Sequence, residues 1–487
     1  MSDKRHVVLI RPHYIIDPRH RDRPMLSMSL LCIGAVLQEA GYRVELVDAP
    51  SDDSYMEAID RLAPGALFAG ITAMSTQIPD GLKIAARLRE IAPQLPIVWG
   101  GVHPSLFPEQ TADSRYCDVV VIGEGDETIV ELAAAIDGDA GFTGIAGIAF
   151  RDGDGVIRRT PPREPPDMDA LPRPAYELLS PGQIALLSAY TPLAVGNATF
   201  IHAGRGCPYR CSFCINPANP WTRRRHRRRN AAAILDDISF LMNRYNIQTF
   251  VLEDDDFFAD RVRLKEFLRE IRRRDMRFFW QASARASDFG DHYIDDRLLE
   301  EMTGVGLIVL GVGAESGSDR TLRLLKKDIS VDQIRRTVTM CRGHALTLVL
   351  SFMIGLPGES RFDMLQTLKE IDRLDALSHN VYLGGPYPYR PYPGSALFEI
   401  IAAEHSFMPE SLEAWSEAAG QSEEAMDGHC FPWSQAPALV LYAAVMVPFI
   451  FVTSRHASVS TLGSLRRAAG RCCHAVYRFR IRNDIWS

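Results

Sequence analysis

The chain has 487 residues but lacks an apolar run long enough to cross a membrane as one helix. Its longest candidate, residues 438–452, is shorter than the roughly 20 residues that a bilayer requires, and Pro448 interrupts it. We expect a buried helix pair in this region and no membrane span, with peripheral membrane contact as the alternative.

An excess of basic charge is also absent. The chain has 54 Lys and Arg residues against 61 Asp and Glu residues, which gives a net charge of -7 at pH 7. A dedicated nucleic-acid-binding protein usually carries a basic balance. The composition therefore argues against nucleic acid as a partner.

Cysteine is scarce and its number is odd, with 9 residues in the whole chain. The N-terminal residues do not read as a secretory signal. We therefore expect a reducing, cytoplasmic location and no disulfide scaffold. Most of the cysteines are scattered along the chain, namely Cys32, Cys117, Cys341, Cys430, Cys472 and Cys473.

The remaining cysteines, Cys207, Cys211 and Cys214, stand together in a loop bounded by glycine. A structural zinc site needs four ligands, and no further cysteine or histidine pair follows at a suitable spacing. Three thiolates in so short a segment fit a cubane iron–sulfur cluster in which one iron lacks a protein ligand. The alternative is a chance group of small buried hydrophobic residues.

The CxxxCxxC spacing, with Phe213 directly before the last cysteine, resembles the signature of the radical S-adenosylmethionine superfamily. This resemblance implies a [4Fe-4S] cluster whose open iron is chelated by S-adenosylmethionine. One electron from the cluster cleaves the sulfonium to give a 5'-deoxyadenosyl radical. An electron donor such as flavodoxin or ferredoxin is the implied partner.

Residues 1–150 alternate short apolar runs with segments of helical periodicity. The apolar runs predict five buried strands joined by helices, which is typical of a doubly wound, flavodoxin- or Rossmann-like parallel sheet. Ligands of such sheets bind at the carboxyl ends of the strands. The predicted strands are residues 7–10, 44–47, 67–71, 97–99 and 119–122.

Small and polar residues at these strand ends resemble the cobalamin-binding domain that is fused to one large branch of the radical S-adenosylmethionine enzymes. The alternative is any flavodoxin-like sheet, because glycine at a strand end is also ordinary turn chemistry. The candidate cobalamin contacts are Thr72, Ser75, Thr76, Gly100, Gly101, His103, Gly123 and Glu124.

The first predicted strand is not followed by an Asp-x-His-x-x-Gly segment, whose histidine ligates cobalt in domains of the methionine synthase type. The resemblance therefore implies cobalt without a protein histidine ligand. His13, His20 and His103 remain possible ligands in principle, although a lone loop histidine is more often a hydrogen-bonding residue.

Residues 151–195 are rich in proline, and we expect a linker without regular secondary structure after a small hairpin with its tip at residues 152–155. Residues 196–405 alternate strands and helices again and predict a partial (β/α)6 barrel, with the cysteine loop after its first strand. Residues 406–487 are expected to be mostly helical. The predicted barrel strands are residues 199–202, 249–252, 278–281, 307–310, 348–354 and 380–383.

The carboxyl ends of the barrel strands supply the groups that an amino acid sulfonium needs. The segments at residues 313–318 and 354–359 resemble the family's fourth- and fifth-strand motifs. The resemblance implies that Glu315 contacts the ribose or the ammonium and that the backbone near Gly355 flanks adenine. We expect the Glu315 carboxylate to be free for the ligand, since it has no sequence neighbour to pair with. The candidate S-adenosylmethionine contacts are Phe213, Glu253, Gln281, Arg285, Glu315 and Gly355.

Three further segments have open interpretations. The acidic residues 254–256 predict a cofactor or divalent metal site, or caps for the next helix. The basic run at residues 223–229 is expected to be a solvated face, with contact to a substrate or corrinoid phosphate as the alternative. The tyrosine- and proline-rich residues 386–395 predict either a wall of a substrate pocket or a rigid exit from the barrel.

A radical generator beside a corrinoid implies a methyltransferase that acts on an unactivated carbon, or on phosphorus, of a small molecule. Members of the same branch catalyse ring closure or rearrangement, so a radical cyclase is the first alternative. A corrinoid-binding sensor with a structural cluster is the second. The substrate and the oligomeric state cannot be read from the sequence.

Overall fold

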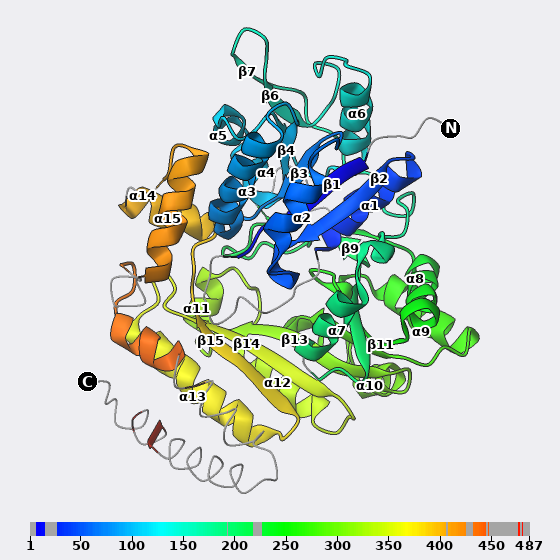
Figure 1. The fold of residues 1–487 in the computed structure, drawn as a ribbon. Helices are drawn as coiled ribbons and strands as arrows, with labels where there is room; N and C mark the ends of the chain where they lie inside the picture. The colour runs from blue at the N-terminus through cyan, green and yellow to red at the C-terminus, as the bar shows by residue number, and fades with distance from the viewer. Residues whose placement is uncertain are drawn as a thin grey trace, which may run out of the picture. The chain divides into compact units, whose positions relative to one another are not determined.

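The structure is a computed structural model that describes residues 6–14, 27–191, 193–217, 226–405, 408–424, 432–444, 447, 476–477 and 480 (Figure 1). The chain forms two compact units. The first comprises residues 1–205, 218–248 and 405–424, and the second comprises residues 206–217, 249–404 and 425–487.

A seven-stranded sheet forms the centre of the first unit, in the order β2-β1-β3-β4-β5-β6-β7. The strands β1 to β5 are parallel, and β6 and β7 add an antiparallel hairpin at one edge. The predicted doubly wound sheet is confirmed, with the chain order reversing between β1 and β3. The strands are β1 (His6–Arg11), β2 (Arg43–Asp48), β3 (Ala69–Thr72), β4 (Ile97–Gly100), β5 (Val119–Val121), β6 (Ile148–Arg151) and β7 (Ile157–Arg159).

Helices cover both faces of this sheet because the parallel strands are apolar on both sides. On one face α1 packs beside α6, and on the other α3 packs beside α2 and α15. The core between α1, α6 and the strands includes Leu9, Leu37, Val98 and Leu132. The helices of the first unit are α1 (Met28–Glu39), α2 (Tyr55–Leu62), α3 (Ile78–Ile91), α4 (Val102–Leu106), α5 (Pro108–Asp113), α6 (Asp126–Asp137), α7 (Pro181–Tyr190), α8 (Ala231–Tyr245) and α15 (Leu412–Glu424).

The expectation that residues 151–195 lack regular secondary structure is wrong for residues 181–190, which form α7. The Ser180 hydroxyl accepts a hydrogen bond from the Gln183 backbone, and Pro181 occupies the first turn. Proline is tolerated there, because the backbone nitrogen of that position has no partner inside the helix. The predicted hairpin tip is confirmed by the hydrogen bond from Asp152 N to Val156 O.

The second sheet has the strand order β15-β14-β13-β12-β11-β8 and confirms the predicted partial barrel. The pairs from β11 to β15 are parallel. Its strands are β8 (Asn197–Ile201), β11 (Ile247–Leu252), β12 (Phe279–Ala284), β13 (Leu307–Glu315), β14 (Thr347–Ile354) and β15 (Val381–Pro388). The last strand extends into the tyrosine-rich segment, which was expected to follow it.

Helices alternate with these strands, and α13 packs beside α12 and against β14 and β15 (Figure 1). The remaining elements of this region are α9 (Arg261–Arg273), α10 (Asp296–Thr303), α11 (Asp319–Leu324), α12 (Val331–Cys341), α13 (Arg361–Leu377) and α14 (Ala396–His405). A short antiparallel pair, β9 (Gly204–Arg205) and β10 (Arg227–Arg228), precedes α8.

Within the described residues, no helix is long and apolar enough to cross a membrane. Residues 437–444 are helical, whereas residues 445–446 and 448–452 of the apolar run lie outside the described part of the chain, as do His20, residues 223–225, Cys430, Cys472 and Cys473.

Candidate active site

The cysteine loop is held in place by the turn at residues 324–328. The Ser212 backbone nitrogen donates to Leu325 O at 2.8 Å, and its hydroxyl donates to Leu324 O at 3.0 Å. This turn is tight because Lys326 and Asp328 adopt left-handed conformations, with φ of 49° and 54°. Sequence reasoning missed the turn, since it lies more than a hundred residues away along the chain.

The three thiols suit a cubane better than a single metal ion. Cys211 is buried, Cys207 and Cys214 are partly buried, and all three are free thiols. Within the described residues, no three His, Cys, Asp or Glu side chains are arranged to hold one ion. A cubane has several irons, so each thiolate can bind its own iron without converging on one point. Burial raises the pKa of the Cys207 thiol to about 12, so cluster binding must displace its proton.

Arg285, at the end of β12, lies against this loop. Its Nη1 atom is 3.7 Å from Cys211 Sγ, and its Nη2 atom donates to the carbonyl oxygen of Lys327. The side chain is 6% exposed. Arg285 was predicted to contact S-adenosylmethionine, and the structure places it in direct contact with Cys211, a predicted cluster ligand.

Glu315 is not the free carboxylate that the sequence led us to expect. Lys327 Nζ lies 2.7 Å from Glu315 Oε1, and both side chains are buried. The expectation was wrong because the partner comes from the turn after α11. Lys327 follows Glu315 by 12 residues, and only the folding of α11 and this turn brings the two side chains together. Within the described residues Lys327 pairs with Oε1 alone, which leaves Oε2 for a ligand, and Lys327 Nζ also lies 5.7 Å from the Phe213 ring centre.

Phe213 and Gly355 lie in largely apolar surroundings. Phe213 packs against a core that includes Leu325, Leu356 and Tyr389. Gly355 has a φ of 78°, and its carbonyl accepts a hydrogen bond from Trp433 Nε1 at 2.8 Å. The side chain of Val440 also covers this glycine. Residues of the C-terminal region therefore contact the backbone that the resemblance associates with adenine.

The acidic residues after β11 have separate tasks. Asp254 forms a buried ion pair with Arg263 at 2.5 Å, and Asp256 caps the next turn by accepting from Phe258 N and Ala259 N. Asp255 accepts hydrogen bonds from Gly206 and Asn216 and so anchors the cysteine loop. Asp256 thus caps the short 3-10 turn 257–259, whereas the next α-helix, α9, is capped by Asp260. Glu253 is exposed, and Gln281 is buried on β12.

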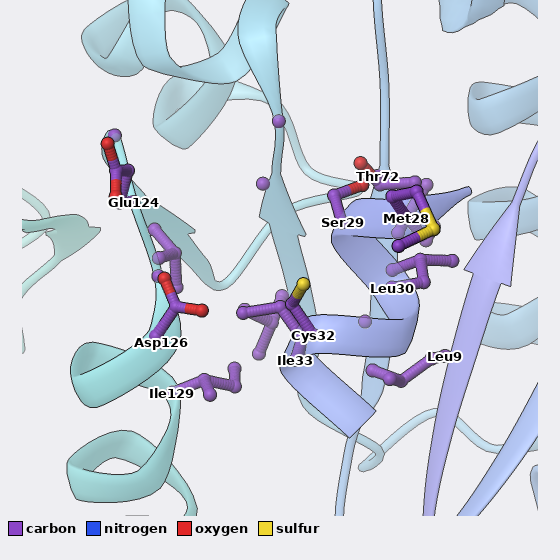
Figure 2. A pocket seen from close by; sticks show the side chains of 18 of the residues that line it. Leu9, Met28, Ser29, Leu30, Cys32, Ile33, Thr72, Glu124, Asp126 and Ile129 are labelled. Atoms are coloured by element: carbon purple, nitrogen blue, oxygen red, sulfur yellow. The ribbon is translucent and has the colours of Figure 1, made fainter. Parts of the chain in front are cut away.

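The first unit contains a cavity of about 270 Å³ at the carboxyl ends of its parallel strands (Figure 2). Figure 2 shows Cys32 and Ile33 on α1 facing Asp126 and Ile129 on α6 across this space. Leu9, Val98 and Val121 contribute further apolar walls. An apolar cavity with a few polar groups at one side fits a buried heterocycle.

Many of the predicted cobalamin contacts line this cavity, namely Thr72, Gly100, Gly101, Gly123 and Glu124, whereas Ser75, Thr76 and His103 are not among its lining residues. His103 is fully buried and packs against Phe107 and Trp415, with Ser75 Oγ 2.9 Å from its Nδ1 atom. Burial lowers the pKa of His103 to about 3, so the ring is neutral. The buried His103 ring thus interacts with the partly buried hydroxyl of Ser75.

A network of charged residues borders the cavity, and sequence reasoning missed it. Arg205 donates to Asp126 at 2.6 Å and to Glu124 at 2.8 Å, and its Nε atom lies 3.2 Å from His202 Nε2. His202 Nδ1 lies 3.6 Å from Cys32 Sγ. Burial and the nearby arginines lower the pKa of His202 to about 3. Arg205 stands two residues before Cys207, but nothing in the local sequence indicated its partners.

Within its described part the basic run is exposed at Arg228, whereas Arg227 is partly buried and Arg229 is buried. Arg227 forms an ion pair with Glu124, and Arg229 forms a buried ion pair with Asp237 at 2.5 Å. The expectation was wrong for Arg227 and Arg229 because Glu124, just before α6, and Asp237, on α8, neutralise them. Both guanidinium groups are therefore engaged by protein carboxylates.

Two sequence families match the chain, each over one of the two sites. The radical SAM superfamily matches residues 201–371, and the B12 binding domain matches residues 21–133.

Several known proteins are similar to the chain over most of its length. It is 27% identical over 380 residues to the anaerobic magnesium-protoporphyrin IX monomethyl ester cyclase of Rubrivivax gelatinosus, covering 76% of this chain and 65% of that protein. It is 27% identical over 384 residues to an uncharacterized methyltransferase of Pyrococcus horikoshii, covering 78% of this chain and 79% of that protein. The cytidylyl-2-hydroxyethylphosphonate methyltransferase of Streptomyces wedmorensis is 23% identical over 397 residues, covering 72% of this chain and 73% of that protein.

Solved structures share the fold. The radical S-adenosylmethionine methyltransferase TsrM of Kitasatospora setae, with cobalamin and a [4Fe-4S] cluster bound, has a TM-score of 0.65 at 21% identity, covering 82% of this chain and 75% of that one. The cobalamin-dependent S-adenosylmethionine radical enzyme OxsB has a TM-score of 0.71 at 15% identity, covering 99% and 73%.

A corrinoid-binding domain followed by a radical S-adenosylmethionine barrel defines a class of enzymes that use both cofactors. The chain belongs to this class, the cobalamin-dependent radical S-adenosylmethionine enzymes. Its cofactors are accordingly a [4Fe-4S] cluster, S-adenosylmethionine and cobalamin.

Proposed function

We propose that the chain is a methyltransferase that acts on an unactivated carbon, or on phosphorus, of a small-molecule substrate. The observation that supports this proposal is the presence, in one chain, of a cavity suited to a corrinoid tail and a loop of three thiols suited to an open cluster. Similarity to methyltransferases from Pyrococcus and Streptomyces supports the same reaction class.

The residues of each site have distinct tasks in this proposal. Cys207, Cys211 and Cys214 hold the cluster, and Glu315, oriented by Lys327, accepts a hydrogen bond from S-adenosylmethionine. When bound, the cluster supplies an electron and cobalamin supplies the methyl group.

In the first unit, the strand-end glycines let the corrinoid nucleotide approach the backbone. Gly100 offers more room than Gly101, because a Cβ atom at Gly100 would meet nothing nearer than Val121 at 3.9 Å. The charged network of Arg205, Glu124 and Asp126 closes one side of the cavity with groups that already satisfy each other.

The test uses S-adenosylmethionine with an isotopically labelled methyl group, which needs no knowledge of the substrate. The protein is reconstituted anaerobically with iron, sulfide and cobalamin and is then reduced. We expect labelled methylcobalamin and 5'-deoxyadenosine. A variant with Cys207, Cys211 and Cys214 all replaced by alanine should lose the cluster absorbance and 5'-deoxyadenosine, and a triple variant that kept both would overturn the cluster assignment.

Ring closure is the second candidate, and the similarity to the Rubrivivax cyclase favours it. A cyclase would form 5'-deoxyadenosine without moving the labelled methyl group to cobalt or to a product. The sensor alternative predicts neither product, and it has no support from the enzymes to which the chain is similar.

A further inference from the structure

The guanidinium group of Arg285 is fixed beside the cysteine loop by contacts on several sides. Its Nη1 atom lies 3.7 Å from Cys211 Sγ, which is within hydrogen-bond reach for sulfur, and Nη2 donates to the carbonyl oxygen of Lys327. The guanidinium carbon lies 3.7 Å from the ring centre of Tyr209. The plane of the guanidinium is thus held between an aromatic ring of the loop and the turn that anchors the loop.

The backbone of Arg285 is also fixed. Its nitrogen donates to Asp288 Oδ2 at 3.1 Å, which closes the turn that follows β12. The side chain is only 6% exposed, and its Nε atom is buried without a hydrogen-bond partner in the described part of the chain. A buried, unsatisfied donor of a cation next to a predicted cluster ligand indicates that an acceptor belongs there.

The acceptor that suits this donor is the sulfur of the cluster. A charge-assisted hydrogen bond to a thiolate strengthens as negative charge accumulates on the cluster during reduction. Hydrogen bonds to the sulfurs and nearby charge set the reduction potential of iron–sulfur clusters. The low exposure of Arg285 keeps water from screening this interaction.

We propose that Arg285 positions Cys211 and raises the reduction potential of the cluster, instead of binding S-adenosylmethionine. This inference rests on the proposed function only in that it requires the cluster. It assigns to Arg285 a task in the electron transfer that precedes any chemistry on the substrate.

The test is a redox titration of the reconstituted full-length protein, followed by paramagnetic resonance in the absence of S-adenosylmethionine and cobalamin. Arg285→Gln, which removes the charge, should shift the midpoint potential of the cluster to a more negative value. Arg285→Lys keeps the charge but loses the planar fork, so its potential should lie between those of Arg285→Gln and the wild type.

A matched control is Arg210→Gln. Arg210 precedes Cys211 directly, but it is 61% exposed and pairs with Asp328 at 3.2 Å. Its replacement removes one positive charge from the cysteine loop itself, and the potential should remain that of the wild type because solvent screens an exposed charge.

Binding of S-adenosylmethionine separates the two possible tasks of Arg285. The proposal would be overturned if Arg285→Gln kept the wild-type potential but bound S-adenosylmethionine about tenfold or more weakly than the wild type. Arg285 would then be a cofactor contact. If Arg285→Gln holds no cluster, the comparison is made on Arg285→Lys, and a wild-type potential there also overturns it. A wild-type protein that assembles no cluster would instead contradict the proposed function.

Discussion

Lys327 Nζ lies 2.7 Å from Glu315 Oε1, and this buried ion pair joins the end of β13 to the turn that carries the cysteine loop. Glu315 adopts a left-handed conformation with a φ of 61°. Gly313 leaves room for the pair, because a Cβ atom there would lie 2.2 Å from Glu315 Oε1 and 2.7 Å from Lys327 Nζ. The ion pair therefore links the end of β13 to the turn at residues 324–328 and, through this turn, to the cysteine loop.

Removal of one member of this pair should destabilise the fold. Lys327→Met leaves the Glu315 carboxylate buried without its cation, and loss of one partner of a buried pair costs about 3–5 kcal/mol. The double variant Glu315→Gln with Lys327→Met should regain part of this loss, since no unpaired charge remains. Denaturant unfolding of the wild type and the variants measures the effect. Equal stability of Lys327→Met and the wild type would contradict it.

The affinity for S-adenosylmethionine should depend on the Glu315 carboxylate. Glu315→Gln is expected to weaken binding about ten- to a hundredfold, which corresponds to the loss of one charge-assisted hydrogen bond. Stability should also fall, because Lys327 loses its charged partner. Equilibrium binding to the reconstituted protein tests this prediction. Normal binding by Glu315→Gln would show that the residue serves the fold alone.

The cavity of the first unit can be blocked at Gly100. Gly100 lines the cavity, and a Cβ atom there would make only ordinary contacts with Val121 at 3.9 Å, so Gly100→Leu should abolish cobalamin retention and Gly100→Ala should weaken it less. Visible absorbance measures the corrinoid, and iron analysis should show an unchanged cluster. Cobalamin retained by Gly100→Leu at the wild-type level would exclude this cavity as the corrinoid site.

Gly101 is a poor choice for the same test, although it also lines the cavity. Its φ is 93°, and a Cβ atom would lie 3.0 Å from the backbone nitrogen and oxygen of Ala73. A bulky residue at Gly101 would strain the domain itself. Loss of cobalamin from such a variant would not distinguish a blocked cavity from a damaged fold.

The burial of His103 should make the free energy of unfolding depend on pH. Its pKa is lowered to about 3 in the folded state, against about 6.5 in the unfolded chain. Between these values the unfolded state binds a proton that the folded state does not. The contribution of the neutral His103 ring to the free energy of unfolding is therefore fully present above pH 6.5. It is lost as the pH falls from 6.5 towards 3, by at most about 1.4 kcal/mol per pH unit.

Denaturant unfolding at pH 7.5 and 5.5 checks this prediction, with His103→Phe as the comparison. Phenylalanine retains the contacts with Phe107 and Trp415 but cannot titrate. The variant should lose less stability than the wild type between the two pH values. An identical loss in both proteins would show that other groups carry the whole dependence.

The sequence alone determined the features that depend on local spacing. Buried strands such as β1 and β5 show as apolar runs, and the cysteine loop shows as a short spacing of rare residues. Both can be read because each is contained in a few consecutive residues. The two sheets, the order of the sites along the chain and the strand-end glycines at Gly100 and Gly123 followed from these patterns.

The tertiary structure decided which side chains meet. Lys327 reaches Glu315, Arg205 reaches Asp126 across 79 residues, and Arg285 lies beside Cys211 across 74 residues. Such pairings depend on which strand ends and turns lie side by side after folding, and no local period records them. The sequence therefore predicted the sites of the cofactors, whereas only the folded chain distinguished a free carboxylate from a paired one.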